Sequence, residues 1–206
     1  MIVFVSLIVV IALIINNENF IVEAISIFLT VLIIEWILNG PKRVIYKSAK
    51  NVLDSTKYLF YSRLLSAKGF EDEQYEYLTS AIPEIKQSSF EERLAKSTSM
   101  LEKLKIEDYV SKFKEYEKAD FDGLNHSAKL LLDDLNKFKN YYFLSLGHIG
   151  RDSLINCIKS SEMLILNSDI IEETVNGDNR NIFLIGYCAH NIYDIIENLN
   201  KLSNQL

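Results

Sequence analysis

Two long apolar runs, separated by a short polar interruption, occupy the first 38 residues of the chain. Residues 1–15 contain Ser6 as their only polar residue, and residues 16–19 (NNEN) interrupt the pattern before it resumes over 20–38. A membrane-spanning helix needs about 20 mainly apolar residues. The pattern therefore predicts a transmembrane helical hairpin over 1–40, with helices at about 1–15 and 20–38. The first helix, roughly 22 Å long, crosses only if its polar neighbours lie among the headgroups or the bilayer thins.

A secretory signal peptide and a buried soluble hairpin are the two alternatives for these runs. A signal peptide needs basic residues before its apolar segment and a small-residue cleavage site after it. No Lys or Arg precedes residue 42, and no Ala-x-Ala motif follows the first run. Helices that are apolar on every side lie in a membrane or in the core of a large protein. Both observations favour the membrane hairpin.

Charge around the apolar runs predicts their orientation. The turn at 16–23 carries two Glu and no basic residue, whereas 42–68 carries seven basic residues against one acid, Asp54. Loops rich in Lys and Arg stay in the cytoplasm, so we expect both termini to be cytoplasmic and the hairpin to lie in the inner membrane. We also expect the first four basic residues to contact anionic lipid headgroups. These residues are Lys42, Arg43, Lys47 and Lys50.

A polar stripe follows one side of the second predicted membrane helix. Glu23, Ser26 and Thr30 are spaced by three and four residues and therefore share one helical face. Such a stripe can line a water-filled path or form a seam between helices of an oligomer. In the simpler alternative, Glu23 reaches the headgroups and the hydroxyls bond their own helix.

The rest of the chain has helical periodicity throughout. The segment 42–67 has one apolar side, and it either begins anew at Pro41 or continues the preceding helix after a kink. Gly69 is expected to end this helix. A capping box is expected to start a further helix at Ser89-Phe90-Glu91-Glu92. Asp122-Gly123 is expected to form a turn.

The clearest apolar spacing lies further along and predicts the core of a bundle. Apolar residues recur at alternating intervals of four and three, as in a heptad seam, at Leu124, Ala128, Leu131, Leu135, Phe138 and Tyr142. No alternating strand pattern occurs. The predicted fold is all-α: a transmembrane hairpin, then a cytoplasmic domain at 41–206 with a basic helix at 42–67, acidic helices within 71–119 and a core bundle over 124–204.

The distribution of charge and the two cysteines further limit the classes of function that fit the chain. Residues 42–68 have a net charge of +6, whereas 69–206, with 15 basic and 24 acidic residues, have −9. The acidic remainder argues against broad nucleic-acid binding, which needs a basic face. Cys157 and Cys188 lie in apolar stretches, so buried free thiols are expected on the cytoplasmic side of a membrane.

Motifs of catalysis and cofactor binding are not found in the sequence. No phosphate-binding loop, dinucleotide fingerprint, zinc spacing or nucleophile elbow occurs, so we expect no enzymatic activity, no cofactor and no metal. Arg180-Asn181 resembles the start of the Arg-Asn-x4-His motif of HEPN ribonucleases, which are all-α. Position 186, where that family has its catalytic His, is Gly here, and His190 lies one turn later.

A glycine-framed polar cluster offers a candidate binding site. The segment 147–152 reads GHIGRD and lies between the two best helical patterns. If a helix begins near Ser153, its N-terminal N–H groups together with His148 and Arg151 could bind an anion such as a nucleotide phosphate. The alternatives are a plain helix–helix turn with Asp152 as N-cap, or an uninterrupted helix whose glycines allow close packing.

Four classes of function fit these features. The layout resembles that of two-span membrane effectors of bacterial anti-phage systems, in which a helical domain receives a signal and oligomerised hairpins perturb the membrane; the likeness is one of architecture. The main alternative is a membrane-tethered scaffold that recruits a cytoplasmic protein. A lysis regulator is disfavoured by the large cytoplasmic part, and a membrane enzyme by the missing motifs. The effector is preferred because a plain tether needs only one span and no polar stripe.

Overall fold

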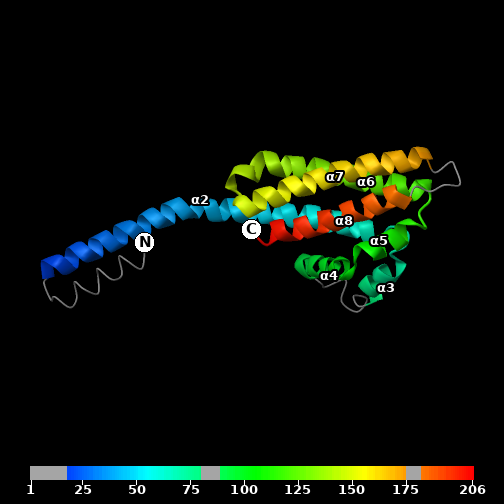
Figure 1. The fold of residues 1–206 in the computed structure, drawn as a ribbon. Coiled ribbons are helices and arrows are strands. Elements are labelled where there is room, and N and C mark those ends of the chain that lie inside the picture. The colour runs from blue at the N-terminus through cyan, green and yellow to red at the C-terminus, as the bar shows by residue number, and fades with distance from the viewer. Residues whose placement is uncertain (1–17, 80–88, 175–181) are drawn as a thin grey trace. The chain divides into compact units, whose positions relative to one another are not determined.

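The computed structural model describes residues 18–79, 89–174 and 182–206, and every regular element within these ranges is a helix (Figure 1). The chain divides into two compact units, Met1–Lys47 and Ser48–Leu206. The expected all-α helical fold is therefore confirmed over the described part of the chain.

The first long helix is continuous through the expected boundary near Gly40. Helix α2 spans Glu18–Leu65 without interruption, so the alternative in which a new helix begins at Pro41 is wrong. A proline inside a helix removes one backbone donor and crowds the preceding turn. The other hydrogen bonds of a long helix remain, and α2 tolerates Pro41 in its interior.

The structure describes only part of the predicted hairpin. The first predicted span at 1–15 and Asn16-Asn17 lie outside the described residues, as do the side chains of Glu23 and Trp36. Among the residues that are described, no helix is found with both the length and the apolar character of a membrane span.

Three long helices form the centre of the second unit. Helices α6 (Lys118–Tyr142), α7 (His148–Thr174) and α8 (Ile182–Ser203) run side by side, with a short 3-10 turn, η1 (Phe143–Ser145), between the first two (Figure 1). The predicted heptad positions on α6 point into the core, and the first five of them are buried. The expected helical bundle is therefore confirmed for the described part of the chain.

Three shorter helices complete this unit: α3 (Glu71–Thr79), α4 (Phe90–Lys103) and α5 (Ile106–Phe113). The predicted capping box of α4 is present, with Ser89 N–H donating to Glu92 and Glu92 N–H donating to Ser89 Oγ. Gly69 ends the preceding segment with φ of +83°, a conformation that glycine adopts without strain.

The expected turn at Asp122-Gly123 is wrong, because both residues lie inside α6. The backbone N–H of Glu117 donates to Asp120 Oδ2 at 2.7 Å, and this interaction starts the helix before the glycine is reached. A glycine inside a helix costs only about 1 kcal/mol relative to alanine, and the long buried face of α6 offsets that cost.

A polar seam attaches the second half of α2 to α8. The buried Tyr61 hydroxyl donates to Asn200 Oδ1 at 2.9 Å, and Ser203 Oγ donates to Asp54 at 2.9 Å. Lys57 lies nearby and is almost fully buried, so desolvation lowers its pKa, although Asp54 and Glu102 act in the opposite direction. Buried polar groups of this kind fix the register of two helices, since a shift would leave them without partners.

Candidate ligand-binding pocket

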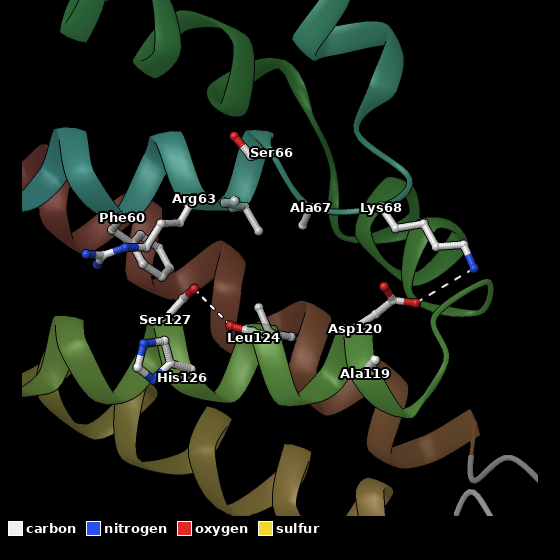
Figure 2. A pocket seen from close by; sticks show the side chains of 12 residues that line it. Phe60, Arg63, Ser66, Ala67, Lys68, Ala119, Asp120, Leu124, His126 and Ser127 are labelled. Atoms are coloured by element: carbon white, nitrogen blue, oxygen red, sulfur yellow. Dashed lines mark hydrogen bonds and ion pairs between the residues drawn. The ribbon is translucent and has the colours of Figure 1, made fainter.

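A pocket of about 450 Å³ opens between the last turns of α2 and the first half of α6 (Figure 2). Small-molecule sites in proteins commonly have volumes of about 300–1,000 Å³. Its walls carry the following residues: Phe60, Arg63, Leu64, Ser66, Ala67, Lys68, Ala119, Asp120, Gly123, Leu124, His126 and Ser127.

Apolar side chains form the inner wall of the pocket. Phe60, Leu64 and Leu124 are all buried, and they belong to the same hydrophobic core that joins α2 to the bundle. The pocket therefore has a firm apolar wall that can hold the body of an aromatic or aliphatic ligand.

Cationic groups lie at both ends of the pocket, and they differ in how they are neutralised. Lys68 Nζ lies 3.5 Å from Glu117 Oε1 and 3.7 Å from Asp120 Oδ2, so its charge is already paired. At the other end, Arg63 extends beside Phe60, and the His126 ring lies across from it on α6 (Figure 2). Within the described ranges, the Arg63 guanidinium has no hydrogen-bond or ion-pair partner.

The position of Gly123 keeps one wall open. A Cβ atom built on this glycine meets no atom within 4 Å. The neighbouring Ser127 hydroxyl donates to the Gly123 carbonyl at 2.9 Å and so is directed along the helix. An unpaired guanidinium beside an apolar wall suits a ligand that combines an apolar body with a phosphate, sulfonate or carboxylate group.

The sequence did not identify this pocket. Arg63 lies in the predicted basic helix 42–67, and His126 lies in the predicted helix that begins at Leu124, but neither was singled out as a site residue. Their proximity depends on how α2 packs against α6, and no spacing along the chain signals it.

The predicted anion site at 147–152 has a different geometry from the one expected. Helix α7 begins at His148 rather than near Ser153, so Asp152 lies within the first turns and is not the N-cap. Arg151 Nε donates to the Phe143 carbonyl at 3.2 Å and Nη2 to the Leu144 carbonyl at 3.0 Å, while His148 Nε2 lies 3.3 Å from Asp152 Oδ2. The two predicted residues thus make separate contacts. Arg151 stabilises the turn between α6 and α7, and anion binding there stays a prediction.

The predicted stripe and headgroup contacts lie mostly on exposed surface. Ser26 and Thr30 are exposed, and Thr30 Oγ1 donates to the Ser26 carbonyl at 2.8 Å, as in the simpler alternative for these hydroxyls. Three of the four predicted headgroup cations are exposed in the first unit: Lys42, Arg43 and Lys47. The fourth, Lys50, lies in the second unit, with Nζ 3.7 Å from Asp54 Oδ2 and 3.4 Å from the Ser203 carbonyl.

The thiols and histidines offer little reactive chemistry. Cys157 and Cys188 are buried free thiols, as predicted, and burial raises the pKa of Cys188 to about 12. His190 is exposed, with Nε2 3.4 Å from Asp194 Oδ2, and Arg180-Asn181 lies outside the described residues. Across 18–79, 89–174 and 182–206, no group of three or more His, Cys, Asp or Glu side chains is arranged to hold a metal ion.

Comparison with known proteins gives no family. No family model matches the chain, and no curated protein or solved structure is significantly similar to it.

Proposed function

We propose that this protein is a two-pass effector of the bacterial inner membrane, of the kind used in anti-phage defence. In this proposal the hairpin at 1–40 lies in the bilayer with both termini in the cytoplasm. Ser48–Leu206 receives a signal, and the hairpins of a homo-oligomer then perturb the membrane. The apolar runs, the basic segment after them and the polar stripe support this arrangement.

The observation that carries the proposal is the continuity of α2. This single helix begins at Glu18, contains the second predicted span and ends at Leu65, next to the pocket. Phe60, Arg63 and Leu64 therefore belong to the same helix as the second predicted membrane span. A ligand bound against them would act directly on that helix, whereas a tether has no need for such continuity.

The chemistry of the pocket defines the class of signal. We propose a small anion with an apolar body, such as a nucleotide or an aromatic phosphate, whose charged group pairs with Arg63. The apolar wall at Phe60 and Leu124 would cover the body of the ligand. A pairing of guanidinium and phosphate is a charge-assisted hydrogen bond, which contributes about 1.5–3 kcal/mol.

Binding of this class is tested with 1-naphthyl phosphate, titrated calorimetrically into the full-length chain in a neutral detergent. We expect binding to need both halves of the probe, so 1-naphthol and inorganic phosphate should each bind at least tenfold more weakly, a loss of about 1.4 kcal/mol. Arg63→Gln should weaken binding, whereas Lys159→Gln, which removes an exposed cation of α7, should not. Equal affinity for the probe and for 1-naphthol would exclude an anion site.

Membrane perturbation is tested in cells with a potential-sensitive dye. Expression of the full chain should collapse the membrane potential, and expression of residues 42–206 should not. If the stripe lines a path, Glu23→Gln should alter the leak and Thr30→Leu should reduce it by drying the constriction. Leu32→Val lies on another face and serves as the control. Wild-type behaviour of both stripe variants would favour the tether.

The tether remains the second candidate because large apolar side chains are exposed at the start of α8. Ile182, Phe183 and Tyr187 are all exposed, and Phe183 is 82% accessible. Exposed aromatic residues are common at protein–protein contacts. A scaffold would recruit a cytoplasmic protein without loss of membrane potential, so the same dye measurement separates the two functions.

A further inference from the structure

The hydroxyl groups that line the pocket between α2 and α6 have already used their hydrogens. Ser127 Oγ donates to the Gly123 carbonyl at 2.9 Å, and Ser66 Oγ donates to the Ser62 carbonyl at 2.8 Å. A hydroxyl carries one hydrogen and two acceptor lone pairs. Because both hydrogens are engaged with the backbone, the two serines can only accept a hydrogen bond from a ligand.

Asp120 offers a further acceptor at one end of the same pocket. Its Oδ2 atom accepts from the backbone N–H of Glu117 at 2.7 Å and lies 3.7 Å from Lys68 Nζ. Its Oδ1 atom accepts no hydrogen bond from any residue in the described part of the chain. The side chain is 24% exposed, so the carboxylate is partly shielded from water. A ligand that covers Oδ1 without donating to it removes its remaining water and gives no hydrogen bond in return, which costs binding free energy.

The two ends of the pocket therefore have opposite hydrogen-bonding character. Arg63, which can only donate, extends beside the His126 ring at one end, and Asp120 meets Lys68 at the other (Figure 2). Asp120 and His126 are six residues apart on α6, which is about 9 Å along the helix axis. A ligand that fills the pocket therefore needs an anionic group at one end and a hydrogen-bond donor at the other.

The charges around Asp120 favour a neutral donor over a cationic one. Lys68 Nζ lies 3.7 Å from Asp120 Oδ2 and 3.5 Å from Glu117 Oε1. An ammonium group placed at Asp120 Oδ1 would lie close to this lysine, and two like charges at such a distance repel each other. An amino group on an aromatic ring donates a hydrogen bond without carrying a charge, so it avoids this repulsion.

We propose that the pocket binds a nucleoside monophosphate whose base carries an amino group. The inference rests on the function proposed above and narrows its class of ligand. The phosphate pairs with Arg63, the base lies against Phe60 and Leu124, and its amino group donates to Asp120 Oδ1. A ribose hydroxyl donates to Ser127 Oγ. A plain aromatic phosphate lacks the donors that these acceptors require.

Adenosine monophosphate and purine riboside monophosphate are matched probes, because they differ only in the amino group of the base. Each is titrated calorimetrically into the full-length chain in the neutral detergent used for 1-naphthyl phosphate. We expect adenosine monophosphate to bind roughly tenfold more tightly, a difference of about 1.4 kcal/mol. One hydrogen bond to a charged acceptor is sufficient for a difference of this size.

Asp120→Asn tests which group accepts from the base. The amide oxygen of Asn can replace Oδ2 as acceptor for the backbone N–H of Glu117, and the amide NH2 then faces the base, where it cannot accept. The preference for adenosine monophosphate should therefore fall below about threefold. The ratio of the two affinities is compared because the lost charge affects both phosphates alike. Asp133→Asn, which changes an exposed aspartate of α6 outside the pocket, should keep the tenfold ratio.

1-Naphthyl phosphate separates failure of this inference from failure of the anion pocket, and its binding to Asp120→Asn shows that the variant is folded. If 1-naphthyl phosphate binds but the two purine nucleotides bind equally, the anion pocket stands and the amino-group contact is overturned. An unchanged tenfold ratio in Asp120→Asn would overturn that contact as well. No binding of any of the three phosphates would overturn both proposals. Tenfold discrimination by the wild type and Asp133→Asn, lost in Asp120→Asn, is the expected result.

Discussion

Two fully buried tyrosines of the second unit provide a matched test of its packing. Tyr109 and Tyr116 are both 0% accessible, yet their hydroxyls differ. Tyr109 donates to the Leu101 carbonyl at 3.1 Å, whereas the Tyr116 hydroxyl has no hydrogen-bond partner within the described part of the chain. The substitutions Tyr109→Phe and Tyr116→Phe each remove one oxygen and leave the ring, so they isolate the contribution of that hydrogen bond.

The two substitutions should have opposite effects on the free energy of unfolding. Loss of the Tyr109 hydrogen bond should cost about 1 kcal/mol, whereas removal of an unsatisfied buried hydroxyl at Tyr116 should stabilise by about 1 kcal/mol or more. The predicted difference is about 2 kcal/mol. Because a chain of this size shifts by about 2–4 °C per kcal/mol, the melting temperatures of the two variants should differ by roughly 4–8 °C.

Circular dichroism melts of the full-length chain in one neutral detergent measure this difference. Burial raises the pKa of both phenols above the ordinary value of 10.0. Above about pH 10 the phenols ionise in the unfolded chain but stay neutral in the folded one, so the free energy of unfolding should fall as the pH rises. Each Phe variant should show a smaller loss there. If Tyr116→Phe destabilises the protein as much as Tyr109→Phe does, the reasoning about the orphaned hydroxyl is refuted.

Three further predictions concern buried or anchoring side chains. Lys57→Met should stabilise the protein at neutral pH by about 1 kcal/mol, since it removes a desolvated charge. Because desolvation lowers the pKa of Lys57, its amine loses the buried charge in the folded protein at a lower pH than in the unfolded chain. The difference in melting temperature between this variant and the wild type should therefore shrink as the pH rises toward 10.5. Arg151→Ala should lower stability by about 1 kcal/mol by freeing two turn carbonyls; an unchanged melt would show that Arg151 does not anchor the turn. Cys157 and Cys188 should resist iodoacetamide until the protein unfolds, as mass spectrometry can show, because burial raises the pKa of both thiols.

The sequence predicted those elements that depend on local periodicity. The heptad positions of α6 and the capping box of α4 follow from spacing alone, and both are confirmed. The start of α7 was missed because the stabilising contacts of Arg151 are made with carbonyls seven and eight residues earlier.

The candidate pocket could not be predicted, for a related reason. Arg63 and His126 are distant in the chain, and their shared pocket depends on the packing of α2 against α6. The charge pattern identified the basic segment that contains both Arg63 and Lys57. It could not show that Arg63 lines a pocket whereas Lys57 is buried at the polar seam.

The polar seam between α2 and α8 has a consequence for the order of folding. Tyr61 meets the Ile196 carbonyl across 135 residues of chain, whereas α6, α7 and α8 contact their neighbours in sequence. At about 5–20 residues synthesised per second, roughly 7–27 s pass between the appearance of these two partners. During that interval the apolar face of α2, with Leu53, Phe60 and Leu64, lacks the helix that later covers part of it. The slow step of folding should therefore be the closure of α2 onto an already assembled α6–α7–α8 bundle, and a chain truncated before α8 should expose that face and aggregate.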